Sequence, residues 1–479
     1  MTANLIGGEW VAARGGRLVE RRNPADVRRV VASAPDSAAE DAHDAVTAVA
    51  EGYREWARQS PERRAEVLAA AAAVLERDPE KLATELVTEE GKTFAEALGE
   101  VRRTPANLRY YASESLRLTG RTYPAASGLV YTARQPVGVV AAITPWNFPL
   151  NIPSRKLGPA LAAGNGVVFK PSEVTPVLAC RLVEALLEAG LPPGAIALVH
   201  GGARVGEALT RDDRVAAVTF TGSTAAGRAI HATVGPHRRC QLEMGGKNPV
   251  VVLEDADVDR AADLIVRGAF GLSGQACTGT SRVLAHDDVH DTLLERVVAR
   301  AEALRLGGGL EDGVHMGPLA TREQHAKTAE YVDAALADGA RLHTGGGPPE
   351  DPRLAHGYFF RPTVFSAVSR TSRLAREEVF GPVLAFLRVS SFEDAIEVAN
   401  GTDYGLSAAI VTRDLGRALA FAEEVGSGLV KVNQPTTGMA MNAPFGGLGA
   451  SSTQTFKEQA GEVMSHFYTV EKTVYVSNG

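Results

Sequence analysis

Cys277 stands in a stretch whose residue types suit a nucleophile. Residues 270–282 read FGLSGQACTGTSR, so small and polar residues surround one of the three cysteines of the chain. Such neighbours keep the sulfur reachable and leave backbone N–H groups free as donors. A thiolate nucleophile needs this access together with a local field that favours the anion. A small residue in a tight turn is the alternative interpretation, and this stretch alone does not decide between the two.

Three other short segments carry side chains that could bind or react. Glu243 lies between an apolar run and a Gly-Gly turn; it suits a general base with a raised pKa or, alternatively, a helix-capping or lysine-paired carboxylate. Lys170 and Glu173 follow an apolar run, where they could contact a dinucleotide ribose or form only a solvated charge pair. Residues 222–227, GSTAAG, could place a phosphate at a helix N-terminus or form only a turn.

The bulk composition limits the classes of function. The chain has 479 residues, of which 45% are hydrophobic and 22% charged, as expected of a soluble protein with two or three domains. A net charge of −7 argues against a nucleic-acid or membrane partner. No apolar run reaches the roughly 20 residues that span a bilayer, and no secretory signal is recognised at the N-terminus. The three cysteines lack metal-ligand spacing, so we expect no metal site and a cytoplasmic location.

Strands and helices alternate from residue 137 to residue 233. The apolar run at 137–144 is typical of a strand buried on both faces of a parallel sheet. Further strands are expected at 167–170, 195–200 and 216–221. Helices are expected at 154–163, 176–189 and 225–233, and one more helix is expected to end at Leu209. This alternation predicts a doubly wound α/β sheet, in which ligands bind at the carboxyl ends of the strands.

Other regions are expected to cover or extend this sheet. Amphipathic helices are predicted at 37–57, 61–76, 79–90 and 93–116, after a hairpin at 4–10. A second alternating region spans 248–445. Residues 129–135 and 467–476 alternate like exposed strands, and an open terminal strand usually pairs, so a partner subunit is expected.

Seven segments together resemble the aldehyde dehydrogenase superfamily, in that family's order. They are PWNFP at 145–149, FKPSE at 169–173, FTGS at 220–223, LEMGGK at 242–247, GQAC at 274–277, EEVFGP at 377–382 and PFGG at 444–447. The resemblance covers nearly the whole chain. It implies an α/β fold with a Rossmann-type dinucleotide-binding domain (1–118 and 137–245), an α/β catalytic domain (246–445) and a small β oligomerisation element with the C-terminal tail (119–136 and 446–479).

The resemblance implies oxidation of an aldehyde to the carboxylic acid with NAD as cofactor and NADP as the alternative. Cys277 matches the nucleophile, which forms a thiohemiacetal and then a thioester. The side-chain amide of Asn147 and the backbone N–H of Cys277 match the oxyanion hole. Glu243 matches the base that activates water and is a candidate for deprotonating Cys277. Because members that transfer the acyl group to coenzyme A lack this glutamate, its presence favours hydrolysis.

The family's cofactor contacts carry over to residues on several strand ends. They are Ile143, Thr144, Pro145, Trp146, Lys170, Ser172, Glu173, Gly206, Phe220, Thr221, Gly222, Ser223, Gly245, Gln324, Glu378 and Phe380. Lys327 is a further candidate near Gln324, and Lys247 is expected to support the Cys277 loop. Glu173 favours NAD because a carboxylate repels a 2′-phosphate. Cys180 and Cys240 are expected to be structural.

The substrate contacts that carry over favour an anionic aldehyde. They are Arg155, Gly271, Ala276, Thr278, Met439 and Phe445. Arg155 falls where semialdehyde dehydrogenases grip a distal carboxylate, and a fork-shaped cation suits that anion; a surface arginine on the helix 154–163 is the alternative. Gly271 stands where succinate semialdehyde enzymes often carry a second arginine.

The branch of the family stays open between several substrates. Residues 432–438 and 467–473 look most like the 2-oxoglutarate semialdehyde branch. Succinate semialdehyde, a phosphono-aldehyde or a neutral aliphatic aldehyde are the alternatives. A catalytically silent structural protein is disfavoured because Cys277, Glu243 and Asn147 are all present. The resemblance also implies a homodimer or homotetramer.

Overall fold

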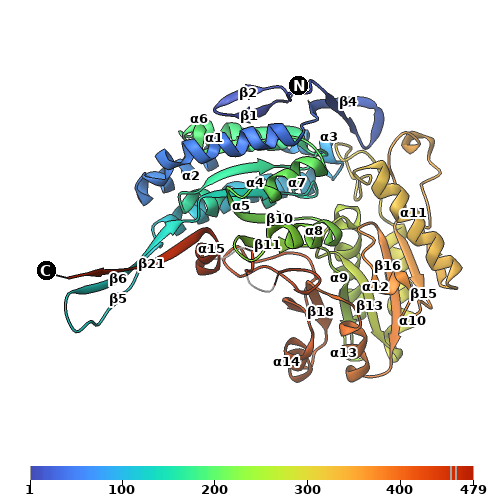
Figure 1. Cartoon of the computed structure of the whole chain (residues 1–479). Helices are drawn as coiled ribbons and strands as arrows, with labels where there is room; N and C mark the ends of the chain where they lie inside the picture. Colours follow the sequence, from blue (N-terminus) through green and yellow to red (C-terminus); the bar gives the residue numbers. More distant parts are fainter. Residues whose placement is uncertain (1, 454–455, 459–460, 478–479) are drawn as a thin grey trace.

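The computed structural model describes residues 2–453, 456–458 and 461–477. Within this part of the chain two seven-stranded sheets lie in separate bodies, and a third sheet of three strands projects as an arm (Figure 1). No helix of the described residues is long and apolar enough to cross a bilayer.

The N-terminal sheet is parallel at its centre and antiparallel at one edge. Its central strands are parallel, while β1 pairs antiparallel with β9 and β2. In spatial order the strands are β11 (Arg239–Glu243), β10 (Val215–Thr221), β7 (Val139–Ile143), β8 (Gly166–Lys170), β9 (Ile196–Leu198), β1 (Asn4–Ile6) and β2 (Glu9–Val11). The chain runs from β7 outward to β9 and then returns to the other side of β7. The strand order therefore reverses between β7 and β10, where such sheets bind ligands.

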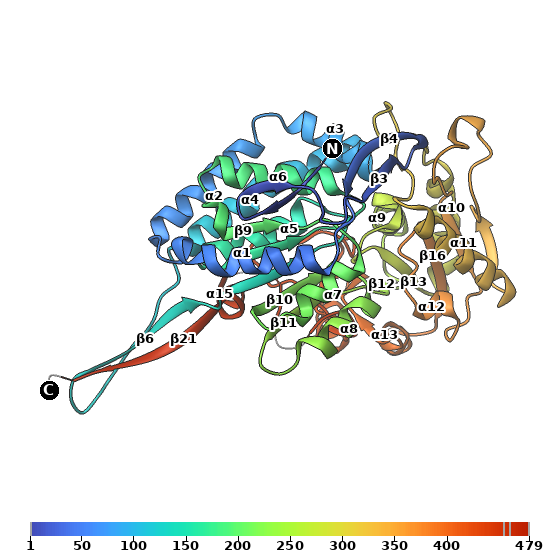
Figure 2. The same cartoon turned by 45° about the horizontal axis from the view of Figure 1, so that its top comes forward.

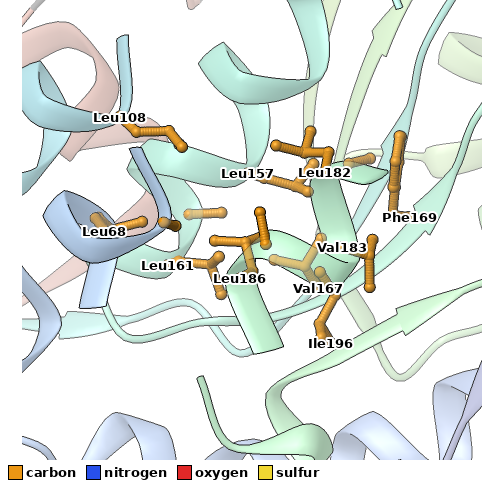
Figure 3. Close-up of a cluster of buried hydrophobic side chains, with 14 of the residues drawn as sticks. Leu68, Leu108, Leu157, Leu161, Val167, Phe169, Leu182, Val183, Leu186 and Ile196 are labelled. Atoms are coloured by element: carbon orange, nitrogen blue, oxygen red, sulfur yellow. The ribbon is translucent and has the colours of Figure 1, made fainter. Parts of the chain in front are cut away.

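Helices cover both faces of this sheet, as the doubly wound prediction requires. The helices of this half are α1 (Ala39–Ala57), α2 (Pro61–Leu75), α3 (Pro79–Glu90), α4 (Phe94–Ser115), α5 (Asn151–Ala162), α6 (Pro176–Glu188), α7 (Ala203–Arg211) and α8 (Thr224–Val234). Alternate residues of β7 point to opposite faces: Val140 and Ala142 pack with α2, α4, α5 and α6, whereas Val139 and Ala141 pack with α1 and α7. Figure 3 shows the first of these two cores, with Leu68, Leu108, Leu157, Phe169 and Leu186 among its side chains.

The C-terminal sheet is the second layered body. In spatial order its strands are β14 (Arg341–Thr344), β15 (Thr363–Ser366), β16 (Val383–Val389), β13 (Thr280–His286), β12 (Asn248–Val252), β18 (Ser407–Val411) and β19 (Leu429–Val432). Its helices are α9 (Val258–Phe270), α10 (Asp287–Glu302), α11 (Arg322–Ala337), α12 (Arg373–Arg376), α13 (Phe392–Asn400) and α14 (Leu415–Glu424). Apolar clusters lie on both faces of its central strands, so this sheet too is buried on both sides.

The arm pairs the end of the chain with a segment from its first third. Strand β21 (Thr469–Val476) lies antiparallel to β6 (Leu129–Pro136), which also pairs with β5 (Thr122–Tyr123). Figures 1 and 2 show this arm extending away from both bodies, with the C-terminus near its tip. Tyr475 at that end is 77% exposed. Two two-stranded antiparallel sheets complete the described sheets: the hairpin of β3 (Leu18–Asn23) with β4 (Asp26–Pro35), and the long-range pair of β17 (Tyr404–Gly405) with β20 (Leu448–Gly449).

The element predictions differ from the structure mainly at helix ends. Helix α5 begins at Asn151, three residues earlier than predicted, so Arg155 lies in its second turn. Phe467 and Tyr468, predicted as strand, instead form the end of helix α15 (Gly461–Tyr468). The Phe467 ring packs edge-on against Tyr468 in this helix and against Phe456 in the preceding segment, so side-chain packing overrides the alternating pattern there.

Candidate active site

The Cys277 loop has an unusual backbone that neighbouring elements hold in place. It follows α9 through a short turn, Gly271–Gly274, in which Leu272 and Ser273 have φ of 54° and 55°. Non-glycine residues rarely adopt this left-handed conformation. Glu96 of α4 accepts a hydrogen bond from the Leu272 N–H at 2.7 Å, and Ser273 Oγ donates to the Gly317 carbonyl at 2.8 Å. The turn that presents the sulfur is thus fixed from outside the loop.

The surroundings of Cys277 disfavour the thiolate, which corrects the expectation of a field that favours the anion. Burial is the largest cause that raises the pKa of the Cys277 thiol to about 12, and the Glu378 carboxylate is the second. The positive charge of Arg155 acts in the opposite direction and lowers this pKa. Glu243 raises the pKa of the thiol as well. The thiol is therefore protonated at neutral pH, and its reaction requires a base or a substrate that changes this field.

Two hydrogen-bond donors converge on the region beside the sulfur. The Cys277 backbone N–H donates to no acceptor among the described residues, while its carbonyl accepts from Asn248 Nδ2 at 2.8 Å. Asn147 Nδ2 donates one hydrogen to the Gln275 carbonyl at 2.9 Å. Its second hydrogen has no acceptor within the described part of the chain. These are the two donors that an oxyanion hole requires.

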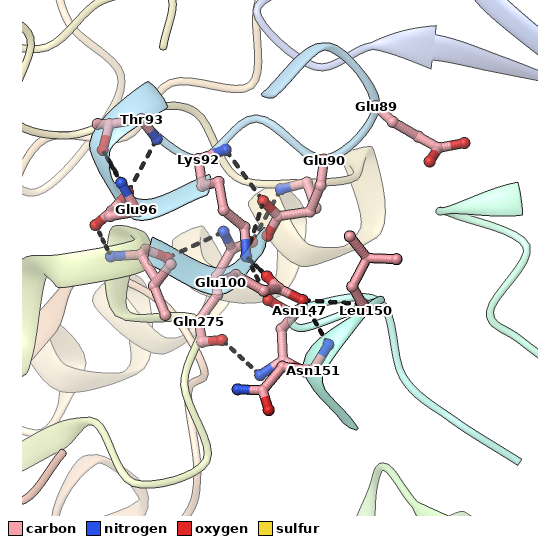
Figure 4. Close-up of polar contacts among 12 residues, drawn as sticks. Glu89, Glu90, Lys92, Thr93, Glu96, Glu100, Asn147, Leu150, Asn151 and Gln275 are labelled. Carbon is pink, nitrogen blue, oxygen red and sulfur yellow. Dashed lines mark hydrogen bonds and ion pairs between the residues drawn. The ribbon is translucent and has the colours of Figure 1, made fainter. Parts of the chain in front are cut away.

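A buried ion pair holds the loop that carries Asn147 (Figure 4). Lys92 Nζ donates to the Asn147 carbonyl at 2.8 Å and to Glu100 Oε2 at 2.7 Å. Glu100 Oε1 accepts from the N–H groups of Leu150 and Asn151 at 2.9 and 3.1 Å. Both charged side chains are 1% exposed, and both Glu100 oxygens have donors. The ion pair therefore fixes the loop between β7 and α5 at three backbone positions.

Glu243 ends strand β11 in a buried position that is only half hydrogen-bonded. Ser452 Oγ donates to Glu243 Oε1 at 2.8 Å, whereas Oε2 has no partner among the described residues. Burial, together with the nearby Glu458 charge, raises the pKa of Glu243 to about 8. A Cβ on Gly446 would lie 2.6 Å from Glu243 Oε1, so this close approach requires glycine. Such a carboxyl suits a general base near neutral pH.

A cluster of buried charges lies next to Glu243. Lys156 Nζ forms an ion pair with Glu458 Oε2 at 2.9 Å and also donates to Thr219 Oγ1. Thr221 Oγ1 donates to the same Glu458 oxygen at 3.2 Å. Glu458 Oε1 has no hydrogen-bond donor in the described part of the chain. The Lys156 and Glu243 charges influence each other, so the two acidic residues and the lysine form one electrostatic unit.

Arg155 is buried beside this cluster, so the alternative of a surface arginine is wrong. Its side chain is 4% exposed, and its guanidinium lies 3.7 Å from Glu458 Oε1. It also contacts Met439 Sδ, and its Cζ lies 5.4 Å from the centre of the Phe445 ring. The structure therefore brings three of the predicted substrate contacts together, with Arg155 acting electrostatically on Cys277.

The predicted cofactor residues lie at the carboxyl edge of the N-terminal sheet. Ile143, Lys170 and Thr221 end three neighbouring parallel strands, and Glu243 ends the fourth. Ser223 caps α8, with its side chain accepting from Ala226 N. The remaining members at this edge are Thr144, Pro145, Trp146, Ser172, Glu173, Gly206, Phe220 and Gly222.

This edge fits a dinucleotide on three observations. Thr144 Oγ1 is buried without a partner among the described residues, and an orphaned polar atom at a strand end suits a ligand. A Cβ on Gly206 would meet nothing nearer than Ile143 Cδ1 at 3.9 Å, so the surface above α7 is open. Lys170 Nζ lies 3.7 Å from Glu173 Oε2; Glu173 is 53% exposed, which leaves its carboxylate available to ribose hydroxyls. Thr221 instead faces Glu458.

Residues from the C-terminal body close over this edge. Glu378 Oε1 accepts from Gly246 N at 3.0 Å, and a Cβ on Gly245 would lie 2.2 Å from Glu378 Oε2. Phe380, with φ of 60°, packs edge-on against Trp146 at 5.6 Å. Gln324, predicted as a ribose contact, donates to the carbonyls of Val379 and Phe380 at 2.9 and 2.8 Å, so it shapes this loop.

The other predicted residues lie in buried or partly buried positions. Cys180 is buried in the core of α6, and Cys240 is partly buried on β11. Lys247 is buried without a hydrogen-bond partner among the described residues, and burial lowers its pKa to about 7. Ala276 and Thr278 flank Cys277 and are buried. A Cβ on Gly271 would meet only Glu96 Oε1, at 3.9 Å.

Comparison with known proteins identifies the family. The model of the aldehyde dehydrogenase family matches residues 10–474. The chain belongs to the aldehyde dehydrogenase family. It is 42% identical to alpha-ketoglutaric semialdehyde dehydrogenase of Bacillus subtilis (99% of this chain, 97% of that protein). It is 41% identical to 2,5-dioxopentanoate dehydrogenase of Saccharolobus solfataricus (98% of each).

Solved structures agree with this assignment. The chain superposes on a crystal structure of betaine aldehyde dehydrogenase from Staphylococcus aureus in complex with NAD+ with a TM-score of 0.96. The identity is 32%, over 100% of this chain and 95% of that one. The aldehyde dehydrogenase fold and the oxidoreductase class predicted from the sequence are therefore confirmed.

Several residues of this aldehyde dehydrogenase site could not be found from the sequence. The sequence predicts that residues 446–479 belong to the oligomerisation element and the C-terminal tail, whereas Ser452 contacts Glu243 and Glu458 pairs with Lys156. Lys92 lies in the connection between α3 and α4, and Glu100 lies in α4, a helix predicted only to cover a sheet. One feature of the sequence could have pointed to this face of α4: the charged residues Glu96, Glu100 and Arg103 follow one another at helical spacing.

Proposed function

We propose that this aldehyde dehydrogenase oxidises an anionic semialdehyde, with 2-oxoglutarate semialdehyde as the preferred candidate, to the carboxylic acid with NAD(P). The observation that carries the proposal is the convergence of the Cys277 sulfur, the Asn147 amide and the partly unpaired Glu243 on one site. The buried Arg155 beside them supports an anionic substrate.

The chain's own residues account for each step of this chemistry. The Cys277 sulfur attacks the aldehyde carbon after losing its proton to a base. The resulting oxyanion accepts from the Cys277 N–H and Asn147 Nδ2, which lie in a site where such donors act strongly. NAD(P), when bound at the carboxyl edge of the N-terminal sheet, supplies the hydride acceptor, and loss of the hydride leaves a thioester on Cys277.

Glu243 then completes the reaction by activating water. Its carboxylate takes a proton from the water that attacks the thioester carbon, and the Cys277 thiolate leaves with the acid released. Glu243 Oε2, which has no partner among the described residues, is the oxygen available for that water. The neighbouring charges of Lys156 and Lys457 lower the pKa of Glu243 and so favour the basic form.

The choice of substrate and cofactor rests on charge and on similarity. Two of the similar proteins carry names that specify the five-carbon semialdehyde. Succinate semialdehyde shares the same distal carboxylate and is the second candidate. The exposed Glu173 favours NAD over NADP because it repels a 2′-phosphate.

The arm supports assembly into a homodimer or homotetramer. Leu129, Tyr475 and Val476 on its strands are exposed apolar side chains, which a partner subunit would cover. The arm would form the oligomerisation element, beside dinucleotide-binding and catalytic domains that meet near residue 245.

The cytoplasm is the compartment that we propose for this enzyme, because a reducing compartment would keep the Cys277 thiol active.

The proposal is tested by steady-state kinetics with a panel of aldehydes. The purified enzyme is assayed with 2-oxoglutarate semialdehyde, succinate semialdehyde, a phosphono-aldehyde, pentanal and benzaldehyde, with NAD and NADP separately. We expect kcat/KM for the semialdehydes to exceed that for pentanal by a large factor. Equal values for pentanal and the semialdehydes would reject the anionic substrate class while leaving the aldehyde chemistry intact.

A further inference from the structure

Helix α4 presents a second cation to the substrate side of the active site. Glu96, Glu100 and Arg103 are spaced four and three residues apart, which places them on one face of the helix. Glu96 holds the Cys277 loop, and Glu100 holds the Asn147 loop. Arg103 is the next residue on this face, one turn beyond Glu100.

Arg103 shares Met439 with Arg155. Its Nη2 donates to the Met439 carbonyl at 2.7 Å, while Arg155 contacts the sulfur of the same residue. The Arg155 charge acts on Arg103 and also on Cys277. Both guanidinium groups therefore contact Met439, and of the two only Arg155 is among the charges that act on the Cys277 thiol.

The two arginines differ in their compensation by acidic groups. Arg155 lies 3.7 Å from Glu458, a carboxylate that Lys156 shares at 2.9 Å. Arg103 is only partly exposed and has no ion pair with any acidic residue in the described part of the chain; besides burial, the charge acting on it is the like charge of Arg155. Of the two arginines, Arg103 is therefore the one that has no acidic partner within the described residues.

We propose that Arg103 is a specificity-determining residue that, with Arg155, binds the distal anionic group of the aldehyde. This inference rests on the proposed function and extends it to a residue outside the family-derived contacts. A carboxylate bound between the two guanidinium groups would relieve their repulsion and accept charge-assisted hydrogen bonds from both. Gly271, across from Glu96, supplies no charge to this region, so α4 is the source of the second cation.

The test compares Arg103→Met with a matched control on the same helix. Arg102 is the neighbouring residue, its side chain is 66% exposed, and its Nη2 lies 4.0 Å from Glu80 Oε1. Arg102→Met therefore removes the same charge from the outer face of α4. Arg103→Lys keeps the positive charge but loses the fork-shaped group. Each variant is assayed with 2-oxoglutarate semialdehyde, succinate semialdehyde and the neutral pentanal.

The expected result is a loss that depends on substrate charge. Arg103→Met should lower kcat/KM for both semialdehydes by about 10- to 100-fold, mainly through KM, because a charged hydrogen bond is lost. Its kcat/KM for pentanal should stay within about twofold of the parent enzyme, as should all values for Arg102→Met. Arg103→Lys should recover part of the loss.

Three outcomes would overturn the inference. Equal losses for pentanal and the semialdehydes would mean that Arg103 only supports Met439. Unchanged kinetics of Arg103→Met with all substrates would mean that Arg103 contacts none of them. A parent enzyme with no preference for semialdehydes would remove the proposed substrate class itself, and this result is recognised in the parent before any variant is made.

Discussion

Two buried charged clusters flank Cys277, and they differ in how completely their hydrogen bonds are satisfied. In the first, Lys92 and Glu100 bind one another and three backbone groups of the Asn147 loop, and both Glu100 oxygens have donors, although Oε1 of the neighbouring Glu90 has none among the described residues. In the second, one oxygen of Glu243 and one of Glu458 have no hydrogen-bond donor among the described residues. A satisfied network is rigid, whereas an unsatisfied buried oxygen can exchange protons or bind water.

This difference separates positioning from proton transfer. The Lys92–Glu100 pair gains nothing from a bound water because its oxygens are occupied, so we assign it to holding Asn147. In the second cluster Glu243 Oε2 is free to accept a hydrogen bond from water, and the pKa of Glu243 is about 8. We therefore assign this cluster to the hydrolytic step. Altering the Lys92–Glu100 pair should therefore affect the stability of the fold and the stabilisation of the oxyanion. Altering the Glu243 cluster should affect turnover and its pH dependence.

The largest effect on turnover is expected for Glu243→Gln. The amide keeps the size of the side chain but cannot accept a proton, so kcat should fall by about 10²- to 10⁴-fold. Thermal unfolding should change little, since Glu243 has no ion pair with any of the described residues that could be lost. Steady-state kinetics and a melting curve of the same preparation check both parts, and a large drop in Tm would contradict the assignment.

Lys92→Met is expected to reduce both stability and activity. Removing one partner leaves Glu100 and Glu90 buried without their cation, which costs about 3–5 kcal/mol. Loss of the bond to the Asn147 carbonyl should also lower kcat by about 10²-fold through misplacement of the amide. Denaturant unfolding and kinetics measure the two effects. Lys81→Met, on the exposed surface of α3, is the control and should change neither.

The pH dependence should follow Glu243. Below a pH of about 8 this carboxyl is protonated and cannot accept a proton from water, so kcat should rise with pH through that value. Glu243→Gln should abolish this rise. A kcat that is flat between pH 6 and 9 in the parent enzyme would show that another step limits turnover or that the pKa of Glu243 is not raised.

Ser452→Ala should give the smallest effect, a displacement of that profile. The Ser452 hydroxyl donates to Glu243 Oε1 and so stabilises the charged form. Its loss should move the midpoint of the kcat profile upward by about one pH unit, the equivalent of one charge-assisted hydrogen bond. A midpoint displaced downward would contradict the direction of this hydrogen-bond effect.

Motifs at strand ends could be predicted from the sequence, whereas long-range partners could not. The apolar runs and glycine turns gave the doubly wound sheet and placed Lys170, Thr221 and Glu243 at one edge, because parallel strands end together. Nothing local indicates that Lys92 meets Glu100 under Asn147, or that Glu458 pairs with Lys156 302 residues earlier. The charges that act on the Cys277 thiol, among them Glu378, Arg155 and Glu243, likewise come from positions far from it in the sequence.

The separation of roles is tested most directly by the pre-steady-state burst of reduced cofactor with a semialdehyde substrate. The account predicts that Glu243→Gln still gives a burst of about one equivalent per active site and then turns over very slowly, because the thioester accumulates on Cys277. Lys92→Met should instead show a slow approach without accumulation, because the step before the thioester is impaired. Loss of the burst in Glu243→Gln would show that Glu243 acts before the thioester forms and would contradict the division between the two clusters.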